Sequence, residues 1–216
     1  MTPRLMANAR RTRVVGRTAA RLNPANSGTD RVFGLSGSVS FSAGAEFEGE
    51  LGCMRHLYVL RHAKSSWDDP DLADHDRPLA PRGRKAAARI AEHLEREAIA
   101  PGLVLCSGAL RTRQTLAALL PVLGGDVEIR LEEGLYGAGA DQVLTRVRET
   151  GDAVSSVLVI GHNPTLHELA LFLTGRVDEL DHFPTGALAS LAFEGSWADL
   201  GEGGAELESF VVPREL

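Results

Sequence analysis

The sequence predicts an α/β fold, a three-layer sandwich in which a mainly parallel sheet carries helices on both faces. Short apolar runs recur along the chain, and each is long enough for a buried strand but too short for an ordinary helix. Segments with apolar residues at helical spacing lie between these runs. Strands that alternate with helices in this way are typical of a parallel sheet. The predicted strands are Leu57–Leu60, Leu103–Cys106, Val127–Leu131, Val157–Ile160, Ala187–Phe193 and Leu207–Val212.

Helix boundaries are marked by proline and glycine. Pro81 is suited to the first turn of a helix, and Pro101-Gly102 interrupts the pattern that follows it. Gly124-Gly125 is expected to stop a second helix, and Gly175 is expected to cap a fourth. The predicted helices are Pro81–Glu97, Leu110–Leu123, Asp141–Glu149 and Thr165–Leu173.

Composition limits the classes of function. The chain has 216 residues, of which 44% are hydrophobic and 24% charged, as in ordinary globular proteins of one domain. Its net charge of −6 argues against nucleic acid as a partner. No apolar run reaches the roughly 18 residues of a membrane span, so we expect no membrane association. Two cysteines, Cys53 and Cys106, form no disulfide framework, and they fit a reducing, cytoplasmic location.

The first 53 residues differ from the rest. They carry a charge of +3, whereas the remainder carries −9, and they are rich in glycine, serine and alanine without any sustained period. We therefore expect an extension without stable order over residues 1–53 and one folded domain over residues 54–216. The run Arg10–Arg13 lacks the apolar core of a secretory signal. A transit-type leader over Met1–Leu35 and a natural start at Met54 both stay open.

Polar groups follow three of the predicted strands. The first strand ends in Arg61-His62, the second opens into a segment with Arg111 at the start of a helix, and the fourth runs into His162. Because parallel strands end at one edge of a sheet, these side chains are expected to converge. Guanidinium groups match phosphate oxygens, and helix amino termini favour anions. The sequence therefore predicts a pocket for a phosphoryl group.

Each of these residues alone has an ordinary explanation. Arg61-His62 can be a charged pair in a loop, and His162 can be a hydrogen-bonded histidine of the core. Arg111 can be solvated or paired with an acid. Their joint occurrence after three strands favours the functional interpretation.

Four ordered segments resemble the motifs of the histidine phosphatase superfamily, and most of all its compact SixA-type phosphohistidine phosphatase branch. The resemblance covers about residues 54 to 212 and includes the expected fold, which is similar to that of phosphoglycerate mutase. The segments are Arg61–Trp67, Arg77–Gly83, Ser107–Thr115 and Gly161–Pro164.

The resemblance implies a role for each matching residue. His62 corresponds to the nucleophile that becomes phosphorylated. Arg61, Arg111 and His162 correspond to the groups that bind the phosphoryl group, and Arg77 corresponds to a lesser substrate contact.

The sequence departs from the family pattern in two places. Glycine usually follows the nucleophile, and here it is Ala63, which is tolerated only if the backbone needs neither a positive φ nor a very close approach. The second departure is the general acid that phosphomonoesterases use, for which no residue stands out. The candidates are Glu132 and Glu133, followed by Asp68, Asp69 and Asp76, and for each of them a solvated loop acid is the simpler interpretation.

These observations predict a metal-independent phosphatase that works through a phosphohistidine enzyme intermediate. An alkoxide leaving group needs help from an acid, whereas an imidazole protonated on its far nitrogen leaves readily. We therefore expect phosphohistidine on a protein as the substrate, no cofactor, and a monomer. Two alternatives remain open: a small-molecule phosphomonoesterase of the same fold, and a phosphate-binding regulator without catalysis.

Overall fold

The computed structural model describes residues 53–216. The predicted extension and its leader segment lie outside the described residues, except for Cys53. Among the residues described, no helix combines the length and the apolar character that crossing a bilayer requires.

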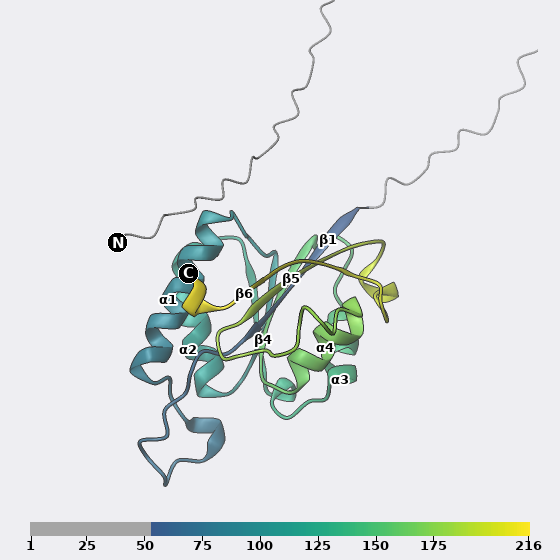
Figure 1. Ribbon diagram of the computed structural model, residues 1–216. Coiled ribbons are helices and arrows are strands. Elements are labelled where there is room, and N and C mark those ends of the chain that lie inside the picture. Colours follow the sequence, from purple (N-terminus) through teal and green to yellow (C-terminus); the bar gives the residue numbers. More distant parts are fainter. Residues whose placement is uncertain (1–52) are drawn as a thin grey trace, which may run out of the picture. The chain divides into compact units, whose positions relative to one another are not determined.

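A six-stranded sheet forms the centre of the fold, in the order β3-β2-β4-β1-β5-β6 (Figure 1). Strands β1 to β4 run parallel, and β5 and β6 are antiparallel to their neighbours, so the sheet is mainly parallel as predicted. The strands are β1 Met54–Arg61, β2 Leu103–Ser107, β3 Glu128–Glu132, β4 Ser156–Gly161, β5 Leu188–Glu194 and β6 Glu206–Val211.

Four α-helices cover the two faces of this sheet. In Figure 1, α1 and α2 lie on one side and α3 and α4 on the other, which gives the predicted three layers. The helices are α1 Pro81–Arg96, α2 Leu110–Leu119, α3 Ala140–Arg148 and α4 Thr165–Thr174. Short 3-10 turns are η1 Asp74–Asp76, η2 Leu120–Val122, η3 Glu133–Leu135, η4 Trp197–Asp199 and η5 Pro213–Glu215.

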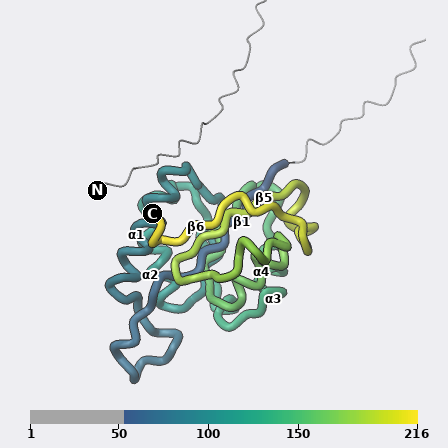
Figure 2. The backbone as a smooth tube through the Cα atoms, viewed as in Figure 1, coloured from purple at the N-terminus to yellow at the C-terminus, as the bar shows by residue number. Residues whose placement is uncertain are grey.

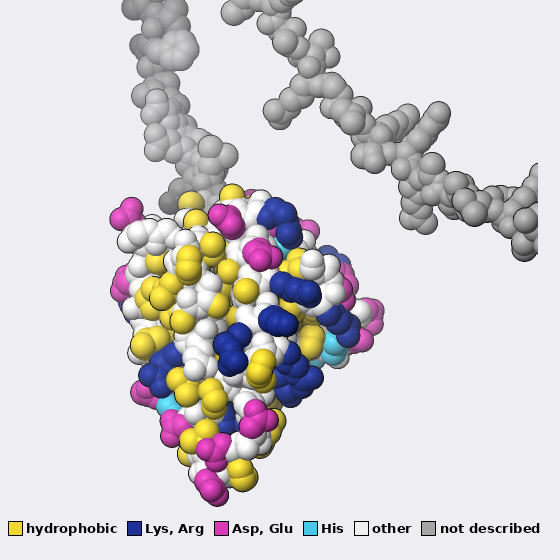
Figure 3. Space-filling view, turned by 90° about the vertical axis from the view of Figure 1, so that its left-hand side faces the viewer, with side chains coloured by type: hydrophobic (Ala, Val, Ile, Leu, Met, Phe, Trp, Pro, Cys, Tyr) yellow, Lys and Arg dark blue, Asp and Glu magenta, His cyan; other side chains and the backbone are white. Residues whose placement is uncertain are grey.

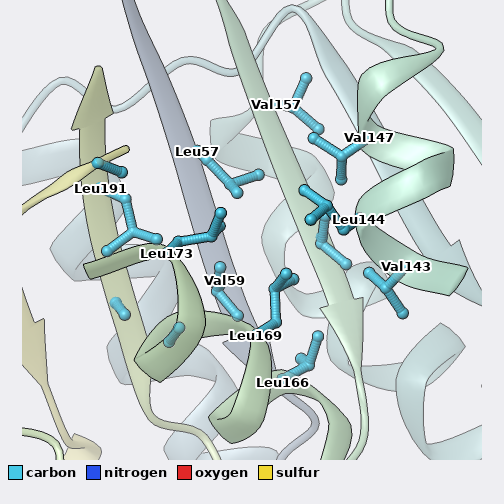
Figure 4. Packing of buried hydrophobic residues seen from close by; sticks show 14 of the residues in the cluster. Leu57, Val59, Val143, Leu144, Val147, Val157, Leu166, Leu169, Leu173 and Leu191 are labelled. Atoms are coloured by element: carbon cyan, nitrogen blue, oxygen red, sulfur yellow. The ribbon is translucent and has the colours of Figure 1, made fainter. Parts of the chain in front are cut away.

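The alternation of side chains along β1 explains why both faces are covered. Leu57 and Val59 point into the core beneath α3 and α4, and Tyr58 and Leu60 point into the core beneath α1 and α2. Figure 4 shows the first of these cores, in which side chains of β1 and β4 meet those of both helices. Each fully buried leucine contributes roughly 1.5–3 kcal/mol, so the central strand holds both layers in place.

The second helix is shorter than predicted. It was expected to reach Leu123, but α2 ends at Leu119 and the chain continues as the 3-10 turn η2. Pro121 lies in this turn, and because proline has no N–H it cannot extend the α-helical hydrogen bonding. The other predicted elements are present, with their ends shifted by a few residues.

Two segments outside the layers matter for the site. The long connection from β1 to α1 carries η1 and extends away from the sheet at the bottom of Figure 1. The chain ends at the opposite side of the fold from α3, with η5 beside α1 (Figure 2), where Arg89 Nη1 donates to the carbonyl of Pro213 at 3.1 Å.

Candidate active site

The register of the sheet brings the three predicted strand ends together. Arg61 pairs with Gly161 across β1 and β4, and Cys106 pairs with Ile160 across β2 and β4. The backbone N–H of His62 donates to the carbonyl of Gly161 at 3.0 Å. The residues that follow these strands therefore leave the sheet at one edge, as expected for parallel strands.

His62 is buried, with 7% of its surface exposed, and its ring is held in one orientation. Its Nδ1 lies 2.8 Å from the carbonyl oxygen of Ala63. Since a carbonyl can only accept a hydrogen bond, Nδ1 carries the proton and Nε2 keeps its lone pair. Burial lowers the pKa of His62 to about 3, and the nearby cations Arg111 and Arg61 act in the same direction. At neutral pH this is an uncharged imidazole with a free nucleophilic nitrogen.

His162 lies next to His62, with 5.2 Å between the ring centroids. Arg111 donates to Nδ1 of His162 across 3.3 Å, so the proton of the neutral ring sits on Nε2, which lies 2.8 Å from Oγ of Ser107. Burial, reinforced by the charge of Arg111, lowers the pKa of His162 to about 4. The two histidines and Arg111 thus form one contiguous group, as the strand ends predict.

Arg61 completes this group from the end of β1. One of its terminal nitrogens donates to the carbonyl of Phe183 at 2.7 Å. Its positive charge contributes to the lowered pKa values of both His62 and His162. Among the described residues, its buried Nε has no hydrogen-bond acceptor. Such a donor is costly to leave unpaired, and an anionic ligand can satisfy it.

Arg111 forms an ion pair with Asp74, a carboxylate that the sequence did not single out. Asp74, in η1, accepts from Arg111 Nη2 at 2.9 Å through Oδ2, and its backbone carbonyl accepts from the other terminal nitrogen. Tyr136 donates to the same Oδ2 at 2.9 Å. Burial raises the pKa of Asp74, but the hydrogen bonds from Tyr136 and Arg77 and the charge of Arg111 outweigh it and lower the pKa to about 2. Asp74 is therefore an anion at neutral pH, and it is hydrogen-bonded to the guanidinium of Arg111.

Arg77 reaches the cluster only through Asp74, to which it donates at 2.7 Å. Its remaining nitrogens donate to Ser65 Oγ and to the carbonyl of Ser66, each at 2.9 Å. Its guanidinium stacks on the ring of Trp67, with 3.1 Å to the centroid. In this structure Arg77 positions Asp74 and makes no hydrogen bond to either histidine of the site.

The two candidate glutamates, Glu132 and Glu133, have different partners. Glu132 forms an ion pair with Arg146 of α3, at 2.6 Å, which ties it to the neighbouring helix. The carboxylate of Glu133 packs against Gly108, the residue after Ser107, so tightly that a side chain at Gly108 would collide with it. The same carboxylate lies 3.2 Å from Nε2 of His75.

The three aspartates bind only local groups. Asp69 accepts from the amide of Asp71, Asp76 contacts His75, and Asp68 is exposed beside Ser66. None of the three hydrogen-bonds to either histidine of the site.

Ala63 fits without strain. No positive φ occurs at this position, and the side chain is fully buried against Leu79 and Ala87. Its amide donates to Oγ1 of Thr115 at 3.1 Å, which fixes the peptide between His62 and Ala63 next to the site. The condition under which alanine is tolerated here is therefore met.

Two further residues of the site carried no clear signal in the sequence, and a third had no predicted role. Asp74 lies in the short turn η1 and Tyr136 follows η3, both without periodicity, whereas Ser107 opens the segment Ser107–Thr115. Their contacts depend on how the loops fold, which local pattern does not encode. Within the described part of the chain, no group of three or more histidine, cysteine or acidic side chains could hold a metal ion.

Comparison with known proteins agrees with this geometry. Residues 57–139 match the family model described as histidine phosphatase superfamily, branch 1. An uncharacterised protein of Mycobacterium tuberculosis is 42% identical over 165 residues, which cover 72% of this chain and 100% of the relative.

Two solved structures are similar over the same region. A candidate phosphohistidine phosphatase SixA from Nakamurella multipartitia is 37% identical with a TM-score of 0.67, over 74% of this chain and 96% of that chain. The corresponding candidate from Agrobacterium tumefaciens is 30% identical with a TM-score of 0.65, over 74% of this chain and 98% of that chain.

Proposed function

The chain belongs to the histidine phosphatase superfamily, in its SixA-type branch, and is a phosphatase; we propose that it removes the phosphoryl group from phosphohistidine on a protein, through a phosphohistidine of its own. The observation that carries the proposal is the hydrogen bond from Nδ1 of His62 to Ala63, which leaves Nε2 free beside His162. The names of the two SixA-type structures support the same substrate class.

In the first step, Nε2 of His62 attacks the phosphorus in line. A P–N bond to His62 forms, and the P–N bond to the substrate breaks with its electron pair on the substrate nitrogen. Because the far nitrogen of that ring carries a proton, the substrate leaves as neutral histidine. Arg61, Arg111 and His162 hold the equatorial oxygens, and the arginines supply the positive charge that balances them.

In the second step, water attacks the phosphorus and the P–N bond to His62 breaks. The electron pair returns to Nε2, the water protons remain with inorganic phosphate, and His62 is again neutral. Both terminal nitrogens of Arg111 bind Asp74 in this structure, so the incoming phosphoryl group competes with this carboxylate for the guanidinium.

The competing activity is a small-molecule phosphomonoesterase, and the position of Glu133 beside Gly108 is the observation that favours it. The test compares kcat/KM of the purified chain, in chelator, on a phosphohistidine-containing protein and on a panel of sugar and nucleotide phosphates. We expect the phosphohistidine protein to be preferred. A preference for a phosphate ester would overturn the proposal, and binding of phosphate without turnover would indicate a regulator.

The variant Glu133→Gln sharpens this comparison. An alkoxide leaving group depends on an acid by about 10²–10⁴-fold, whereas neutral histidine does not. We therefore expect this variant to keep its activity on phosphohistidine. Glu95→Gln, an exposed carboxylate in the last turn of α1, is the matched control. A loss of phosphohistidine activity in Glu133→Gln alone would place the acid in the reaction and contradict this mechanism.

A further inference from the structure

A cavity of about 620 Å³ on the α1 side of the molecule is lined by cations. We call it the basic groove. Half of the residues that line it are cations, namely Lys64, Arg82, Lys85, Arg89 and Arg214. Figure 3 shows Lys and Arg side chains gathered on this face, which is the side of α1 and the C terminus in Figure 1.

The charge of the basic groove is not balanced locally. No acidic residue lines it, and of its five cations only Arg214 forms an ion pair within the described residues, with Glu215 at 3.5 Å. Both lysines of the whole chain lie in it, although the chain has a net charge of −6. Unpaired like charges repel one another, so this arrangement is most stable when an anionic partner is bound.

The cations on α1 form a row. Arg82, Lys85 and Arg89 are spaced by three and four residues, which places them on one face of the helix over roughly 10 Å. One phosphoryl group is much smaller than this row. The spacing instead matches several carboxylates presented side by side on a protein surface.

The basic groove adjoins the candidate active site. Lys64 follows His62 by two residues, and Pro184 and Thr185 also line the groove. These two residues directly follow Phe183, whose carbonyl binds Arg61, and they precede Gly186, whose amide contacts the carbonyls of Arg61 and His62. A protein whose phosphorylated histidine reaches His62 would therefore place its neighbouring surface on the groove.

We propose that the basic groove binds an acidic surface of the phosphoprotein substrate next to its phosphorylated histidine. This inference rests on the proposed function and extends it to how the substrate protein is recognised. Exposed charges of this kind act mainly on encounter and affinity, so they are expected to change KM rather than kcat. Salt screens them, because the Debye length falls to about 3 Å at 1 M.

The test uses the full chain and two synthetic peptides with one phosphohistidine each, one flanked by glutamates and one by serines. We expect the wild type to prefer the glutamate-flanked peptide by about tenfold in kcat/KM at low salt, mainly through KM. High salt and the double variant Lys85→Glu/Arg89→Glu should both abolish this preference. Hydrolysis of free phosphohistidine should stay unchanged in the variant.

The matched control is Arg130→Glu/Arg176→Glu, which changes the net charge equally at two arginines outside the groove, the half-buried Arg130 and the exposed Arg176. It should keep the preference. Equal rates on the two peptides in the wild type would overturn the docking proposal while leaving the proposed function in place. Failure to hydrolyse any phosphohistidine compound would instead overturn the proposed function itself.

Discussion

The environment of His62 couples its chemistry to the stability of the protein. The pKa of this ring falls to about 3 and that of His162 to about 4, from an ordinary value of 6.5. Burial, the main cause in both cases, favours the uncharged form in the folded state. The unfolded chain takes up these two protons near pH 6.5, whereas the folded chain does not.

The contribution of these two histidines to the free energy of unfolding should therefore be fully present above pH 6.5. It should be lost as the pH falls from about 6.5 to about 4 for His162 and to about 3 for His62. Each histidine contributes a slope of up to about 1.4 kcal/mol per pH unit. Replacing His62 with Asn, whose amide can still donate to Ala63, should reduce this slope. Urea unfolding at several pH values measures it, with the exposed His182→Asn as control. An identical slope in wild type and His62→Asn would contradict the assigned neutral state.

Asp74 competes with phosphate for Arg111, because its carboxylate binds that guanidinium directly. The variant Asp74→Asn removes the negative charge. Arg111 is buried and Asp74 is half exposed, so solvent screens the pair only in part. A contribution of about 1 kcal/mol from the pair means that inorganic phosphate should inhibit the variant at about fivefold lower concentration. The control is Asp76→Asn in the same turn, which contacts only His75. Weaker inhibition of Asp74→Asn by phosphate would show that Asp74 orients Arg111 rather than competing for it.

At the scale of elements, helices α1 and α4 both end with a residue in the left-handed conformation. This residue is an alanine in α1 and a glycine in α4. Helix α1 ends in a motif in which Ala98 donates to Glu95 and Ile99 donates to Leu94, with Ala98 at φ 53°. Helix α4 ends at Gly175 with φ 65°. Only glycine adopts this conformation without strain, so α1 carries a cost that α4 avoids.

Substitutions at these two positions should have opposite effects. Ala98→Gly should raise the free energy of unfolding and Gly175→Ala should lower it, each by about 1 kcal/mol, with activity unchanged. An added Cβ at Gly175 meets nothing within 4 Å, so its effect comes from the backbone alone. Thermal unfolding of both variants provides the measurement. A loss of stability in Ala98→Gly would contradict the strained cap.

The elements themselves were largely predictable from sequence, because each is encoded by its own neighbours. Apolar runs such as Leu103–Cys106 predicted the buried strands, and apolar residues at helical spacing predicted the helices. The predicted end of α2 was wrong because Pro121 stops the helix about one turn before Gly124 and Gly125. The turn η1 was not predicted, since its three polar residues have no period to read.

At the scale of the molecule, the meeting of Arg61, His62, Arg111 and His162 was predictable because parallel strands end at one edge. The contact between Asp74 and Arg111 was not predictable, because it depends on how the long connection from β1 to α1 folds.

The basic groove was hidden for a different reason. It combines cations from three distant segments, such as Lys64, Lys85 and Arg214, in a chain whose net charge is negative. Composition reports only the sum of these charges and not their distribution.

The most direct test of the account is to trap the phosphorylated enzyme. The chain is mixed with a phosphohistidine substrate, quenched in alkali to preserve P–N bonds, digested, and analysed by mass spectrometry. We predict one phosphoryl group, on His62, and neither label nor turnover in His62→Ala. A phosphoryl group on His162, or full activity in His62→Ala, would contradict the account.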